Sequence, residues 1–126
     1  MEVFGSRWKN HWQRIAADWK SRVSDDDVVL IAGDTSWAMH LKEAQEDLDQ
    51  IRALPGKKII IRGNHDYWWE SAGKLNRMDA ENNMQYLYGS TAVLGDKDIA
   101  ICGTHGWVCP GDIHYQEDRD AKPYRR

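Results

Sequence analysis

The stretch IIIRGNHDYWW, residues 59–69, runs from a hydrophobic strand into polar side chains and then into two tryptophans. Its first part is continuous, apolar and β-branched, which is typical of a strand buried on both faces. After Gly63 come an amide, an imidazole and a carboxylate in a row, at Asn64, His65 and Asp66. Three side chains of the kind that bind ligands thus follow the most hydrophobic strand. The question is which other residues the fold brings next to them.

The sequence upstream supplies a matching unit. Residues 28–32, VVLIA, form a second short apolar strand, predicted to be covered on both faces and followed by Asp34. Residues 40–54 carry apolar side chains at a helical period before a Pro-Gly stop. Strand, helix and strand (residues 58–61) form a βαβ crossover, in which the two strands are parallel. Asp34 and Asn64 therefore belong on the same edge of the sheet, where open α/β sheets place their ligands.

The N-terminal segment has the apolar spacing of an amphipathic helix. Ser6 is a suitable cap, and the helix is expected to run to about Val23. Trp8, Trp12 and Trp19 fall on one face of it, so core packing is the expected role of all three.

The downstream sequence predicts a helix from about residue 70 to 79, short strands and a helix near the end of the chain. The strands are expected at residues 86–88, 91–94 and 99–102, the last two paired as a hairpin, and Pro123 is a candidate helix start.

Composition limits the class of protein. The 126 residues suit one domain, and 41% hydrophobic with 29% charged residues is ordinary globular material. A net charge of −3 argues against a nucleic-acid surface. No apolar run is long enough to span a bilayer, and the first residues lack a signal-peptide pattern, so a cytoplasmic location is expected. Cys102 and Cys109 are interpreted as reduced thiols.

The residue types at the strand tips fit metal chemistry. The carboxylate of Asp34, the amide of Asn64 and the imidazole of His65 form a mixed set suited to manganese, iron or zinc. Asp66 is placed to orient the imidazole, and the glycines at 33 and 63 let the backbone turn and approach a ligand closely. Alone, either segment reads equally well as a turn whose side chains cap backbone groups. Two of them on one sheet edge favour a functional site.

The same residues carry a family resemblance. Gly33-Asp34, followed by Gly63-Asn64-His65-Asp66, resembles two motifs of the calcineurin-like metallophosphoesterases. The similarity extends over nearly the whole chain, through residues 31–39, 63–69, 101–104 and 106–107, and these stretches resemble a bacterial branch of predicted phosphohydrolases. The fold it implies is α/β, a metallophosphoesterase fold with a layered α-β-β-α sandwich and βαβ units.

The resemblance also implies an activity. Family members hydrolyse a phosphomonoester or phosphodiester with a metal-activated hydroxide at a two-metal centre. By this resemblance, Asp34 bridges the two metal ions, Asn64 binds one of them, and His65 stabilises or protonates the leaving oxygen. Manganese is the expected metal, with iron or zinc as alternatives, and a phosphate ester is the expected substrate.

The chain also departs from the family pattern. It has no Asp-x-His before Asp34, and no Gly-His-x-His segment follows the hairpin. We therefore expect a single, truncated domain spanning residues 1–126, with the first strand and the C-terminal part of the family fold absent. As such a fragment, the chain is expected to bind metal weakly and to be inactive. The competing interpretation is a degenerate, non-catalytic scaffold or interaction module.

Two further features stay open at this stage. His105 follows a strand and is either a phosphate contact or substitute metal ligand, or an ordinary loop histidine. Trp68 and Trp69, just after the polar tip, suit a substrate wall and core packing about equally.

Overall fold

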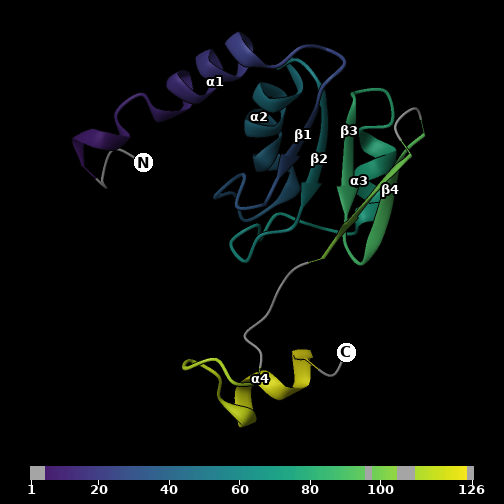
Figure 1. The fold of residues 1–126 in the computed structure, drawn as a ribbon. Helices are drawn as coiled ribbons and strands as arrows, with labels where there is room; N and C mark the ends of the chain where they lie inside the picture. Colours follow the sequence, from purple (N-terminus) through teal and green to yellow (C-terminus); the bar gives the residue numbers. More distant parts are fainter. Residues whose placement is uncertain (1–4, 96–97, 105–109, 125–126) are drawn as a thin grey trace.

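The N-terminal segment contains two short helical elements. A computed structural model describes residues 5–95, 98–104 and 110–124 (Figure 1). In it, the 3-10 turn η2 (Ser6–Trp8) is followed by helix α1 (His11–Arg22). The expected helix does form, but its expected start at Ser6 is wrong. Asn10 adopts the left-handed conformation (φ 53°), so the helix begins only after it. Asparagine tolerates this conformation better than most residues.

The central unit is a pair of βαβ crossovers. Strand β1 (Val28–Ile31), helix α2 (Leu41–Arg52) and strand β2 (Lys57–Ile61) form the first crossover. Helix α3 (Ala72–Met78) and strand β3 (Met84–Leu87) complete the second. The strands are parallel in the order β1-β2-β3, with Ile31 opposite Ile60 and Ile61 opposite Leu87. The predicted crossover and its parallel strands are confirmed.

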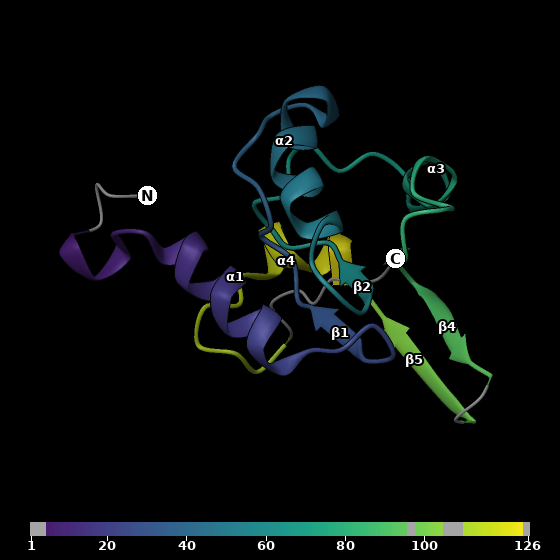
Figure 2. The same cartoon turned by 90° about the horizontal axis from the view of Figure 1, so that it is seen from above.

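Each face of this sheet has its own hydrophobic core. On one face, α2 and α3 pack over β2 and β3, and Ala44, Leu48 and Ile51 are the buried face of α2, as predicted. On the other lies the predicted hairpin, formed by β4 (Ser90–Leu94) and β5 (Ile99–Gly103). Figure 2 shows α2 and α3 on one side of the sheet and the hairpin on the other. The mixed α/β fold with βαβ units is thereby confirmed.

Strand β1 is less covered than the sequence predicts. It lies at the edge of the three-stranded sheet, and the side chain of Leu30 is 62% exposed. In the core on the hairpin side, the buried sheet residues are Ile59 of β2 and Leu87 of β3, and β1 contributes only the partly buried Val28. An apolar run therefore identified the strand but not its position in the sheet.

The described tryptophans differ widely in burial. Trp68 and Trp69 are 1% and 7% exposed and belong to the helix-side core, where Trp69 packs edge-on against Tyr86 with ring centroids 5.4 Å apart. Packing, not a substrate wall, is their role. By contrast, Trp8 is 45% exposed, and α1 has no buried residue. The prediction of core packing is therefore wrong for Trp8, whereas Trp12 does pack against the helix-side core.

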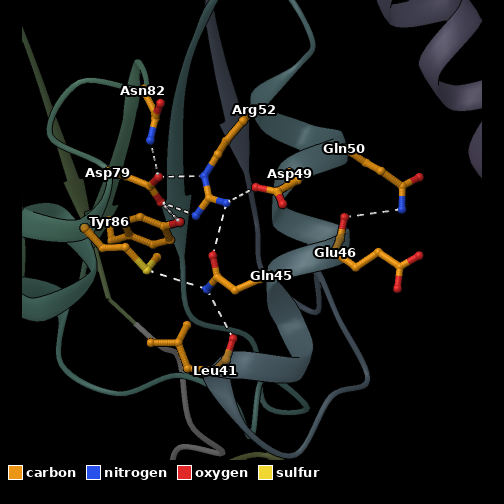
Figure 3. Close-up of polar contacts among 10 residues, drawn as sticks. Leu41, Gln45, Glu46, Asp49, Gln50, Arg52, Asp79, Asn82 and Tyr86 are labelled. Carbon is orange, nitrogen blue, oxygen red and sulfur yellow. Dashed lines mark hydrogen bonds and ion pairs between the residues drawn. The ribbon is translucent and has the colours of Figure 1, made fainter.

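A buried ionic network joins α2 to the region between α3 and β3 (Figure 3). The guanidinium of Arg52 donates to both carboxylate oxygens of Asp79, at 2.6 and 3.0 Å, and the hydroxyl of Tyr86 donates to one of them at 2.6 Å. Burial opposes ionisation of Asp79, but the hydrogen bonds from Arg52, Tyr86 and Asn82 outweigh it and lower the pKa of its carboxyl. Burial, reinforced by the bond to Asp79, raises the pKa of Tyr86.

A buried lysine hydrogen-bonds to carbonyl groups at the C-terminal end of α2. Lys58 is 2% exposed, and its ammonium donates to the carbonyl oxygens of Arg52 and Leu54. Carbonyls at a helix C-terminus have no partner within the helix and attract a cation. Desolvation by burial lowers the pKa of Lys58.

The last element is helix α4 (Glu117–Tyr124), which lies apart from both sheets in Figure 1. Pro123 does not start this helix but lies near its end. In the part of the chain that the structure describes, no helix has the length and apolar character needed to cross a membrane.

Candidate functional site

The tips of β1 and β2 lie together at the carboxyl edge of the sheet. They border an open hollow of about 320 Å³. Both tips contribute to its lining, which consists of Ala32, Gly33, Asp34, Ile61, Arg62, Gly63 and Asn64. The parallel crossover thus brings Asp34 and Asn64 to one site, as their positions after the two strands predict.

Two glycines allow this approach. Gly33 has a φ of 95°, and a Cβ there would overlap the backbone nitrogen of Gly63. A Cβ on Gly63 would in turn overlap the backbone nitrogen and carboxylate of Asp34. The sequence suggests that these glycines make room for a ligand, whereas in the structure they make room for each other's strand tip. Asp34 is itself left-handed (φ 54°), a conformation that costs a non-glycine residue about 1–3 kcal/mol.

Asp34 and His65 contact each other directly across the two tips. One carboxylate oxygen of Asp34 accepts the backbone N–H of His65 at 2.9 Å, and the other lies 3.0 Å from Nδ1 of its ring. Both side chains are about half exposed, at 44% and 58%. The amide nitrogen of Asn64 lies 3.2 Å from Nε2 of the same ring. Asp34 thus occupies Nδ1 of the His65 ring, and the Asn64 amide lies beside Nε2.

Asp66 has a different role from the one expected. It is completely buried, and its carboxylate accepts the backbone N–H groups of Asp34, Thr35 and Gly63, all at 2.8 Å. It also accepts the Thr35 hydroxyl at 3.0 Å and the indole N–H of Trp68 at 2.9 Å. Asp34, and not Asp66, contacts the imidazole of His65. Asp66 instead fastens the two strand tips together.

Sequence reasoning missed the partners of Asp66. Thr35 directly follows Asp34, and a hydroxyl beside a site aspartate was the available signal. Trp68 was weighed only as a wall or a core residue, although its indole N–H required an acceptor if buried. His105, the candidate phosphate contact or substitute ligand, and Cys109 lie outside the described residues.

The donors at the site suit a divalent cation. Asp34 and Asn64 both line the hollow, so a carboxylate and an amide are brought to it side by side. Carboxylate and amide oxygens are ligands of hard and borderline cations. Over residues 5–95, 98–104 and 110–124, no group of three or more His, Cys, Asp and Glu side chains is placed to hold a metal ion.

Comparison with known proteins identifies the family. The family model described as calcineurin-like phosphoesterase matches residues 6–124, which is nearly the whole chain. The chain therefore belongs to the calcineurin-like phosphoesterase family, whose members generally use divalent metals. No curated protein and no solved structure matches it significantly.

Proposed function

We propose that this chain is a metal-dependent phosphoesterase whose reaction takes place at the tips of β1 and β2. Family membership supports the class of reaction, hydrolysis of a phosphate ester. The assignment of the reaction to particular residues rests on one observation. The Asp34 carboxylate contacts His65 beside the Asn64 amide. The carboxylate and the amide line one hollow that is open to solvent, and the imidazole contacts both of these side chains.

The residues divide the work according to their chemistry. Asp34 and Asn64 would hold divalent cations through oxygen atoms, with manganese as the first choice and iron or zinc next. Such cations activate water and offset the charge that develops on a phosphoryl group. His65 is held at Nδ1 by Asp34, so Nε2 is the nitrogen we assign to the leaving oxygen.

We expect weak cation binding and negligible hydrolysis by the chain itself. The described part of the site offers one carboxylate and one amide, with no cluster of three or more acidic, histidine or cysteine ligands. Paired cations require more ligand atoms than these two side chains supply. The same observation favours the second candidate function, a non-catalytic scaffold.

Manganese titration followed by a hydrolysis assay tests the proposal. Three proteins are compared: the unmodified chain, Asp34→Asn, and the control Asp26→Asn, which alters an exposed turn on the N-terminal side of β1. Loss of a ligand should weaken manganese binding at least about tenfold in Asp34→Asn and leave the control unchanged. With excess manganese and a 4-nitrophenyl phosphomonoester or phosphodiester, hydrolysis by the unmodified chain should be negligible, and any trace of it should be absent from Asp34→Asn.

The outcomes separate the two functions. Equal hydrolysis by the unmodified chain and Asp34→Asn would overturn the phosphoesterase assignment at this site. Manganese binding that depends on Asp34, without hydrolysis of either ester, would favour the scaffold. Two tight manganese sites would contradict our expectation of weak binding.

A further inference from the structure

The sequence Tyr67-Trp68-Trp69 divides between the inside and the outside of the protein. Both tryptophans are buried in the helix-side core, whereas Tyr67 is 55% exposed. Its backbone is held, because the Tyr67 N–H donates to the carbonyl of His65 at 2.8 Å and the Trp69 N–H donates to that of Asp66 at 3.1 Å. The exposed ring of Tyr67 therefore projects from a hydrogen-bonded turn, which follows His65 and precedes the two buried tryptophans.

The ring of Tyr67 stands against the ring of His65. Their centroids are 6.3 Å apart and their planes meet at 75°, an edge-to-face arrangement. The imidazole in turn contacts Asp34. An exposed aromatic ring therefore borders the group to which we assign the leaving oxygen.

A second exposed ring comes from the other strand tip. Trp37 lies three residues beyond Asp34 and is 66% exposed, while its neighbour Ser36 is buried and donates to Asp47 of α2. The Trp37 segment is tied to the Tyr67 segment where Asp66 accepts the backbone N–H of Thr35. Each strand tip that contributes to the hollow thus continues into an exposed aromatic residue.

We propose that Tyr67 is a specificity-determining residue that packs against the organic part of the substrate. This inference rests on the proposed function and names a substrate class for it: phosphate esters whose leaving alcohol carries an aromatic ring. Aromatic rings gain from mutual packing beyond simple area burial. A tyrosine also loses little conformational freedom on binding, because it has only two side-chain torsions.

Binding of phosphonates tests the proposal without requiring turnover. Benzylphosphonate and ethylphosphonate have the same phosphonate group and differ in the aromatic ring, and neither has an ester oxygen to lose. In the presence of manganese, the unmodified chain should bind benzylphosphonate roughly three- to tenfold more tightly than ethylphosphonate. Tyr67→Ala should abolish this ratio, and Tyr67→Phe should keep it.

Trp8→Ala is the matched control. Trp8 is also an exposed aromatic residue beside a histidine, with ring centroids 5.7 Å from His11, but it belongs to η2 at the far N-terminal end of the fold (Figure 1). Its removal should leave the ratio unchanged. A ratio near one in the unmodified chain, failure of both phosphonates to bind, or an unchanged ratio in Tyr67→Ala would each overturn the inference.

Hydrolysis distinguishes this inference from the proposed function. Phenyl phosphate and a nucleoside 5′-phosphate are compared with ethyl phosphate, which has no ring. The first carries its ring directly on the leaving oxygen, and the second carries an aromatic base farther from it. A preference for either aromatic ester that Tyr67→Ala removes supports the inference. Equal hydrolysis of all three esters would overturn it and leave the phosphoesterase assignment standing. Ring-dependent phosphonate binding without hydrolysis would support the role of Tyr67 and count against the assignment.

Discussion

The buried carboxylate of Asp66 accepts the backbone amide of Asp34, a residue 32 positions earlier in the chain, at 2.8 Å. Through this bond, a residue of the loop after β2 holds the backbone of the loop after β1. The two aspartates of the site therefore differ in function. Asp34 is half exposed and faces the hollow, whereas Asp66 is buried and holds the backbone that carries Asp34.

Asp66→Asn should destabilise the fold strongly. An amide places an N–H₂ group among N–H donors that now share one carboxylate, and a buried donor without an acceptor is costly. We expect a loss of about 3 kcal/mol in the free energy of unfolding, measured by urea denaturation. The matched change Asp34→Asn, on an exposed side chain, should cost less than about 1 kcal/mol. Similar losses for both variants would contradict this division.

Gly63→Ala should damage the site even if the chain folds. A Cβ at this position overlaps the backbone and carboxylate of Asp34, so the two strand tips must separate. We expect the free energy of unfolding to fall by at least about 2 kcal/mol. Manganese binding should weaken as well. Gly73→Ala is the control, because this helical position has room for a Cβ and should gain about 0.5–1 kcal/mol. A Gly63→Ala variant as stable as the unmodified chain would show that the tips are not in close contact.

Asp79→Asn should cost about 3–5 kcal/mol, because it leaves the guanidinium of Arg52 without its buried counter-ion. The control is Asp18→Asn, which breaks the exposed pair with Arg22 and should change stability by less than about 0.5 kcal/mol. Chemical denaturation of both variants provides the measurement. Equal effects would mean that the Arg52 network adds no more than a surface pair.

Acid should reduce the difference between the unmodified chain and Asp79→Asn. The pKa of Asp79 is lowered from its ordinary value of 3.8, so the folded state binds this proton less well than the unfolded state. The stabilisation is fully present above about pH 4 and is lost as the pH falls through the lowered pKa. The difference in unfolding free energy should shrink as the pH falls below about 4, by up to ~1.4 kcal/mol per pH unit. A difference independent of pH would exclude this linkage.

Sequence periodicity predicted most of the fold. The apolar runs before Asp34 and Asn64 and the helix between them determined the parallel crossover, because local patterns and chain connectivity suffice for it. The exposure of Leu30 was not predictable in this way. A continuous apolar strand reads the same at the centre and at the edge of a sheet, and its position depends on strand neighbours distant in the chain.

The site was predictable in its location more than in its internal contacts. Strand ends placed Asp34, Asn64 and His65 together, but the partner of each side chain depends on ångström-scale backbone geometry. Asp66 adjoins His65 in the sequence, yet its side chain turns into the interior, where Trp68 and three backbone amides meet it. Likewise, the break at Asn10 has no signal in an apolar spacing that continues across it.

The burial of Asp66 also affects what a ligand must do when it binds. Loops that become ordered only on binding reduce affinity by the conformational entropy that they lose. Here the backbone at both strand tips is already fixed by a carboxylate that no ligand touches. A cation or phosphate ester arriving at the hollow would need to reorient only exposed side chains, such as those of Asn64 and His65. The organisation of the site is therefore a property of the protein core, present before any ligand binds.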